Sequence, residues 1–178
     1  MPVELYDFLL DMGSFPQREL PPDDLRSTRN ENSGLPGARR DLGQAAAFRL
    51  AWDIDPSLLD GFTETRGGLL TVPSELRKAC LAHLMALAAQ GSGAAQEVFR
   101  RVGRHIGQIS REMAPLLLPQ TEVRYLFGRF VKEPACFRLL QEGCREIAPS
   151  LCLEAADEDL TCTPLMRSLA EQGVTVAQ

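Results

Sequence analysis

The chain has 178 residues, of which 44% are hydrophobic and 24% are charged, and its formal net charge is −5. This length and composition predict a single globular domain over residues 1–178 with one sizeable core. The negative charge argues against nucleic acid or an acidic membrane as a partner. The most apolar run is too short to span a bilayer, and the N-terminus lacks the features of a signal peptide. We therefore expect a cytoplasmic protein.

Cysteine and histidine usage agrees with that location. The odd number of cysteines and their wide spacing predict buried, reduced thiols and not a disulfide framework. The cysteines lie at positions 80, 136, 144, 152 and 162. The two histidines, His83 and His105, are too few and too far apart to predict a metal site. For Cys80, a core position with His83 beside it is the favoured interpretation, and His105 is expected at the edge of a buried face.

The N-terminal part combines an apolar run with a long polar loop. Val3–Met12 fits a strand or a short helix equally well. Residues 13–37 hold repeated prolines and glycines between polar side chains, which predicts a long polar loop. A helix is predicted over Arg39–Trp52. An irregular stretch follows, with one helical turn at Pro56–Leu59 and a tight turn at Gly67–Gly68.

Two further helices complete a mainly helical part over residues 38–118. The first begins near Pro73, and the second runs over residues 94–115. In the second helix, apolar side chains recur every three or four residues and predict a buried face. They are Phe99, Val102, Ile106, Ile109 and Met113. Gly103 and Gly107 lie in a separate line of small residues. Because glycine inside a helix costs about 1 kcal/mol relative to alanine, we expect another element to approach closely there.

The remaining part, residues 119–172, alternates between strand and helix patterns. Strands are predicted over Glu122–Val131 and Ser150–Ala155, with a helix over Pro134–Ile147 between them and a short helix over Leu165–Ala170 after them. This alternation is typical of a parallel sheet. The fold class is therefore α/β and helix-rich.

Two charged clusters are candidates for chemistry. One is a basic side of the long helix, formed by Arg100, Arg101, Arg104 and Arg111. A solvated face paired with Glu97 and Glu112 is favoured there over a site for a phosphate or an acidic partner. The other is the acidic run Asp157–Asp159, for which a solvated loop is favoured over a metal site or a general base. The chain has no phosphate-loop, nucleophile-elbow or dinucleotide motif, and no catalytic residue is identified.

The order of the motifs resembles a known family. Gly103-Arg-His-Ile-Gly107 lies on the long helix, Val123-Arg-Tyr-Leu-Phe-Gly128-Arg129 follows as a strand, and a second strand ends at Ala155-Ala-Asp157. This order is similar to the C-terminal part of the ROK family, within the sugar kinase and actin-like ATPase superfamily. The segment Leu42–Leu50 also looks like an early helix of that family.

The resemblance implies a fold, a ligand and a partner. The fold would be the C-terminal lobe of an actin-like ATPase, with a partial parallel or mixed sheet and packed long helices. Gly128 and Arg129 would correspond to the turn near the adenosine, so the implied cofactor is ATP or ADP with Mg²⁺. A complete protein of this kind would be an ATP-dependent sugar kinase. The implied partner is an N-terminal ATPase lobe, or a second copy in a homo-oligomer that packs through the long helix.

The chain also departs from the family pattern. The Asp-x-Gly-x-Thr phosphate segment, the catalytic aspartate and the cysteine-rich zinc signature are all missing. We therefore expect either a fragment of a longer protein or a reduced relative, derived from a sugar kinase and inactive as an isolated chain, that retains part of a nucleotide or sugar cleft. The alternative is a helical interaction or scaffold domain without nucleotide binding. Its partner surfaces would be the arginine face and the loop over residues 13–37.

Overall fold

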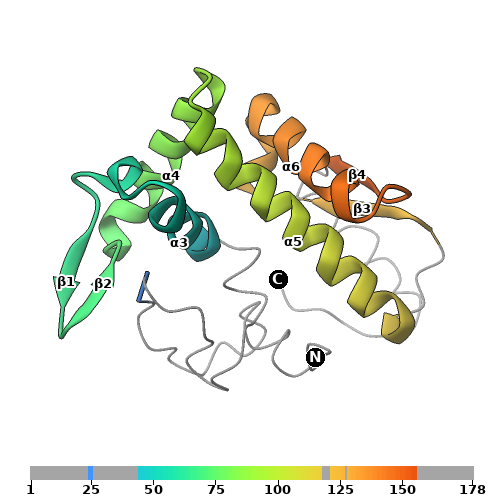
Figure 1. Cartoon of the computed structure of the whole chain (residues 1–178), viewed down its shortest axis with the longest axis horizontal. Coiled ribbons are helices and arrows are strands. Elements are labelled where there is room, and N and C mark those ends of the chain that lie inside the picture. The colour runs from blue at the N-terminus through green and yellow to red at the C-terminus, as the bar shows by residue number, and fades with distance from the viewer. Residues whose placement is uncertain (1–23, 26–43, 118–120, 127, 156–178) are drawn as a thin grey trace, which may run out of the picture.

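The computed structural model in Figure 1 describes residues 24–25, 44–117, 121–126 and 128–155. Within these ranges the chain forms four α-helices, two short 3₁₀ helices and two two-stranded sheets, which agrees with a helix-rich α/β class. The elements are α3 (Gln44–Ile54), η1 (Pro56–Leu59), β1 (Glu64–Arg66), β2 (Leu69–Thr71), α4 (Ser74–Ala89), α5 (Gly93–Leu117), β3 (Val123–Leu126), η2 (Arg129–Val131), α6 (Pro134–Ile147) and β4 (Cys152–Ala155). The predictions for Val3–Met12 and Leu165–Ala170 lie outside the described residues.

The first half of the described fold is α3, a helical turn and a hairpin. The predicted turn at Pro56–Leu59 is confirmed as η1, which Asp55 caps by accepting a hydrogen bond from the Ser57 N–H. β1 and β2, which the sequence did not predict, pair antiparallel around Gly67 and Gly68. Both glycines have positive φ, +56° and +81°, as a two-residue hairpin turn requires.

One residue of the predicted polar loop over 13–37 is fixed against this hairpin. The Leu25 N–H donates to the Leu70 carbonyl over 2.8 Å, and the Leu25 side chain is buried. The loop therefore contributes an apolar residue to the core.

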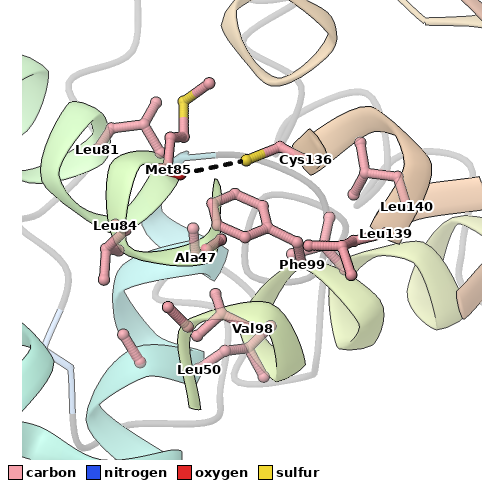
Figure 2. Close-up of a cluster of buried hydrophobic side chains, with 14 of the residues drawn as sticks. Ala47, Leu50, Leu81, Leu84, Met85, Val98, Phe99, Cys136, Leu139 and Leu140 are labelled. Carbon is pink, nitrogen blue, oxygen red and sulfur yellow. Dashed lines mark hydrogen bonds between the residues drawn. The ribbon is translucent and has the colours of Figure 1, made fainter. Parts of the chain in front are cut away.

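The long helix α5 crosses the molecule between the two halves (Figure 1). It extends past Pro115, two residues beyond the predicted end. Pro115 cannot donate a hydrogen bond to the Arg111 carbonyl, and the helix ends two residues later. Figure 2 shows Phe99 of α5 among buried side chains from α3, α4 and α6, including Ala47, Met85 and Leu139. Because all four helices contribute to one cluster, the described residues share a single core.

The second half is a parallel strand–helix–strand unit. β3 pairs with β4 in parallel, with Val123 opposite Cys152 and Leu126 opposite Ala155, and α6 connects the two strands. The predicted parallel arrangement and the bounds of α6 are confirmed. The prediction that the first strand continues to Val131 is wrong, because the backbone turns at Gly128 and residues 129–131 form η2.

Candidate functional site

The candidate site for a ligand is the turn at the carboxyl end of β3. Gly128 has φ +101° and ψ −165°, a backbone conformation that is essentially restricted to glycine. A Cβ built at this position would meet no atom within 4 Å, so the requirement for glycine is conformational and the space beside the backbone is open. Because β3 and β4 are parallel, their carboxyl ends lie at the same end of the sheet. Open α/β sheets bind ligands beyond the carboxyl ends of their strands.

The residues that follow Gly128 fix the turn to the core. Arg129 is exposed and begins η2. Phe130 packs edge-on against Phe99 of α5, with 5.8 Å between the ring centroids. Glu133 caps α6, since its Oε1 accepts a hydrogen bond from the Ala135 N–H over 3.4 Å. This carboxylate occupies the helix end that would otherwise attract an anion. The turn therefore offers an open backbone and the exposed Arg129, with the N-terminal end of α6 already capped by Glu133.

The sequence predicted a close neighbour at the glycines of α5, and the structure shows that this neighbour is α6. A Cβ added to Gly103 would overlap the backbone carbonyl of Leu140, and one added to Gly107 would lie 3.0 Å from the Cys144 carbonyl oxygen. The reciprocal contact is made by Gly143 of α6, where a Cβ would overlap the Arg100 carbonyl. The sequence analysis did not single out Gly143. This close approach occurs within one chain.

The predicted basic side of α5 is largely paired within the fold. Arg101 contacts Glu97 on the same helix, as expected, whereas Arg100 and Arg104 reach across to α6. The Arg104 guanidinium bonds to Glu146 over 2.6 Å and to Glu97 over 2.7 Å. Burial alone would raise the pKa of Glu97, but hydrogen bonds from Arg104 and Arg101 lower it.

Two details of that prediction are corrected. The expected carboxylate Glu112 accepts a hydrogen bond from Gln108, and Arg111 donates to the Ile147 carbonyl. The carboxylate partners on α6 were missed because they lie 42 residues further along the chain, and helical spacing predicts only partners on the same helix.

Three of the four cysteines in the described part of the chain are buried in the core. Cys80, Cys136 and Cys144 are buried, and Cys152 is exposed. Burial raises the pKa of the Cys80 thiol to about 12, and burial together with the nearby Glu133 carboxylate raises that of Cys136 to about 12. These thiols are therefore poor nucleophiles at neutral pH.

The histidine positions fit the sequence analysis. The His83 ring is half-buried and tilted against Phe62, with 5.2 Å between the ring centroids. His105 is half-buried at the edge of the apolar face of α5, as predicted.

The described ranges contain no group of three or more His, Cys, Asp or Glu side chains placed to hold a metal ion. The acidic run Asp157–Asp159 lies outside these ranges. Among the helices that the structure describes, none is both long and apolar enough to span a bilayer.

Comparison with known proteins identifies no relative. The chain matches no family model, no curated protein and no solved structure.

Proposed function

We propose that the chain is a domain derived from a ROK-like sugar kinase, inactive alone, that retains the nucleoside-contacting part of an ATPase cleft. The observation that carries this proposal is the β3–α6–β4 unit, in which the first parallel strand is followed by Gly128 in a conformation that glycine alone adopts readily. The long helix α5 before it carries Gly103 and Gly107 in close contact with α6. This succession fits the C-terminal lobe of an actin-like ATPase fold.

The proposal assigns Gly128 and Arg129 to the nucleotide and leaves catalysis to a second lobe. Phosphoryl transfer needs a metal ion, a cation on the phosphates and a base placed around one reacting group. Glu133 fills the N-terminal end of α6, so the phosphates of ADP would point away from this helix. The adenosine would lie against the open backbone of Gly128, and the Mg²⁺ and sugar contacts would come from the complementing ATPase lobe.

The test is a thermal melt with Mg-ADP and, separately, with a panel of hexoses. A ligand at about one hundred times its dissociation constant adds about 2.7 kcal/mol of stability, which for a domain of this size is a shift of roughly 5–10 °C. We expect a shift with Mg-ADP that Gly128→Ala abolishes. Gly91→Ala is the matched control, because Gly91 also has a positive φ, +96°, with open space beside it, but lies in the α4–α5 turn.

A melt that neither Mg-ADP nor any hexose shifts would reject the nucleotide site. The scaffold alternative would then be favoured. Its partner surface would have to lie away from Arg100 and Arg104, because both guanidinium groups already bond to carboxylates of α6.

A further inference from the structure

The outer edge of β3 has backbone groups that face away from β4. The Cys152 N–H donates to the Glu122 carbonyl over 2.8 Å, and the register places Val123 opposite Cys152. Since successive strand residues direct their backbone groups to opposite sides, Glu122 and Arg124 face β4, whereas Val123 and Tyr125 face outward. We call these outward groups, together with those of Thr121 in the bend that precedes β3, the β3 edge.

The opposite edge of the sheet is closed by a side chain. The Leu153 carbonyl of β4 points away from β3 and accepts a hydrogen bond from Gln141 Nε2 of α6 over 3.0 Å. Tyr125 of β3 is 60% exposed, so one face of the sheet is not fully covered where this side chain lies. Parallel sheets are usually buried, and two strands alone are marginally stable. Among the described residues β3 pairs with β4 alone, so its outer side has room for a further strand.

The charges beside the β3 edge are self-complementary. If two copies of β3 run antiparallel with Val123 opposite its own counterpart, Thr121 faces Tyr125 and Glu122 faces Arg124 of the other copy. All three outward residues then form hydrogen-bonded pairs, and two opposite-charge pairs flank the axis. A register centred on Arg124 would place two guanidinium groups opposite each other, which is destabilising. The charge pattern therefore favours one register.

Arg124 has two alternative sets of partners in this arrangement. In the single chain its Nη1 donates to the Thr121 and Val123 carbonyls over 2.7 and 2.9 Å, so the guanidinium covers part of the β3 edge. Glu122 is exposed beside it. Turning Arg124 onto Glu122 of the second copy would free both carbonyls for strand pairing.

We propose that the β3 edge is a self-association surface, on which a second copy of the chain adds its own β3 to form a continuous sheet β4–β3–β3–β4. The inference rests on the edge geometry and the charge pattern, and it does not depend on nucleotide binding.

The test is sedimentation equilibrium over a concentration series. We expect the wild-type chain to form a reversible dimer that weakens as salt is added, since the charge pairs are screened. Glu122→Lys and Arg124→Glu should each raise the dimer dissociation constant about tenfold, because two attractive pairs become repulsive. The double charge swap should restore the dimer. Lys78→Glu is the control, since it changes charge at an exposed position of α4 and should leave the constant unchanged.

Three results would overturn the proposal: a monomer at every concentration, a dimer indifferent to Glu122→Lys, or a double swap as weak as the single variants. Hydrogen exchange at the Tyr125 amide shows whether a segment of the same chain, and not a second copy, covers the β3 edge. Slow exchange in a monomeric sample would mean that a segment of the same chain covers the β3 edge, which also contradicts self-association. Because Glu122 is exposed, the Glu122→Lys variant should fold normally and keep the test decisive.

Discussion

At the scale of single residues, Gly143 shows how closely two helices of this fold approach. The position lies in the interior of α6, where alanine would ordinarily be favoured by about 1 kcal/mol. The Arg100 carbonyl occupies the space that a Cβ would need, and a backbone atom cannot move aside as the end of a side chain can. The steric conflict therefore outweighs the helix propensity.

We expect Gly143→Ala to lower the free energy of unfolding by about 3 kcal/mol, the upper part of the range for overpacking. Urea unfolding followed by circular dichroism measures this change. Gly93→Ala is the control, because Gly93 begins α5 and no atom lies within 4 Å of a Cβ built there. It should leave stability unchanged or raise it by up to about 1 kcal/mol. Equal effects of the two substitutions would contradict the close contact.

Exposed and buried thiols should also differ in their rate of alkylation. Cys152 is exposed on β4, whereas Cys80, Cys136 and Cys144 are buried, and burial raises the pKa of each of the three. Since the thiolate is the reactive form, we expect iodoacetamide to modify Cys152 before Cys80, Cys136 and Cys144 in the native protein at pH 8. Peptide mapping by mass spectrometry assigns the modified sites. Modification of Cys80 at the rate of Cys152 under native conditions would show that its side of the core is open to solvent.

At the scale of elements, the long periodic helices were predictable and the short elements were not. The bounds of α6 follow from Pro134 at its start and from a clear helical period, so the prediction over Pro134–Ile147 agrees with the structure. β1 and β2 have three residues each, too few for an alternating pattern, and only the turn at Gly67–Gly68 was visible. Strand propensity also placed Val131 in β3, whereas the strand ends at Leu126 and residues 129–131 form η2 after Gly128.

The candidate site was predictable only in part, for a similar reason. The sequence indicated Gly128 and Arg129 by resemblance. No motif indicated that the Glu133 carboxylate would cap α6 beside them. The glycines of α5 predicted a close neighbour without naming it. The neighbour, α6, and its carboxylates are brought there by tertiary structure alone, since they lie far along the chain.

The ion pairs between α5 and α6 lead to a prediction for these elements. Arg104 bonds to Glu97 and Glu146, and its side chain is 31% exposed. We expect Arg104→Met to lower the free energy of unfolding by about 1 kcal/mol at low salt, and by less at high salt. Arg138→Met is the control, because Arg138 is 68% exposed and 3.7 Å from Glu142. Its effect should be close to zero.

The same cluster predicts an acid dependence. The pKa of Glu97 is lower in the folded state than in the unfolded chain. Its stabilising contribution is therefore complete above the unfolded value of about 4.3, and it is lost as the pH falls through the folded value. The difference in stability between wild type and Arg104→Met, measured by urea unfolding from pH 7 downward, should shrink over this range. A difference that stays constant to acid pH would show that Arg104 acts through packing alone.

At the scale of the whole molecule, α5 joins the two halves, and thiols are buried on both sides of it. Cys80 belongs to α4, and Cys136 and Cys144 belong to α6. All three side chains are part of one core cluster with Phe99 of α5. Cys136 Sγ also lies 3.8 Å from the Met85 carbonyl, so it links α6 to α4 directly (Figure 2). Protonation of these thiols is therefore coupled to the integrity of the whole core.

This coupling predicts a loss of stability in alkali. The pKa of Cys80 and of Cys136 is raised to about 12 in the fold, against about 8.5 in an unfolded chain. Between these values the unfolded chain has lost the proton and the folded chain retains it, so stability falls as the pH rises. Because pH 10 lies about 1.5 units above the unfolded pKa and still below the folded one, the loss of stability there is about 2 kcal/mol for each thiol. We expect a fall of about 4 kcal/mol from these two groups between pH 8 and pH 10.

Urea unfolding under reducing conditions at the two pH values measures this fall. Replacing Cys80 and Cys136 by alanine will lower stability at both pH values through the cavities that it creates, so the informative quantity is the change between pH 8 and pH 10. That change should shrink by about 4 kcal/mol in the double variant, and Cys152→Ala, at the exposed thiol, should preserve it. The same fall in the double variant as in wild type would mean that titration of lysine and tyrosine accounts for the loss of stability between pH 8 and pH 10. The buried thiols would then not be the groups that couple proton release to opening of the shared core.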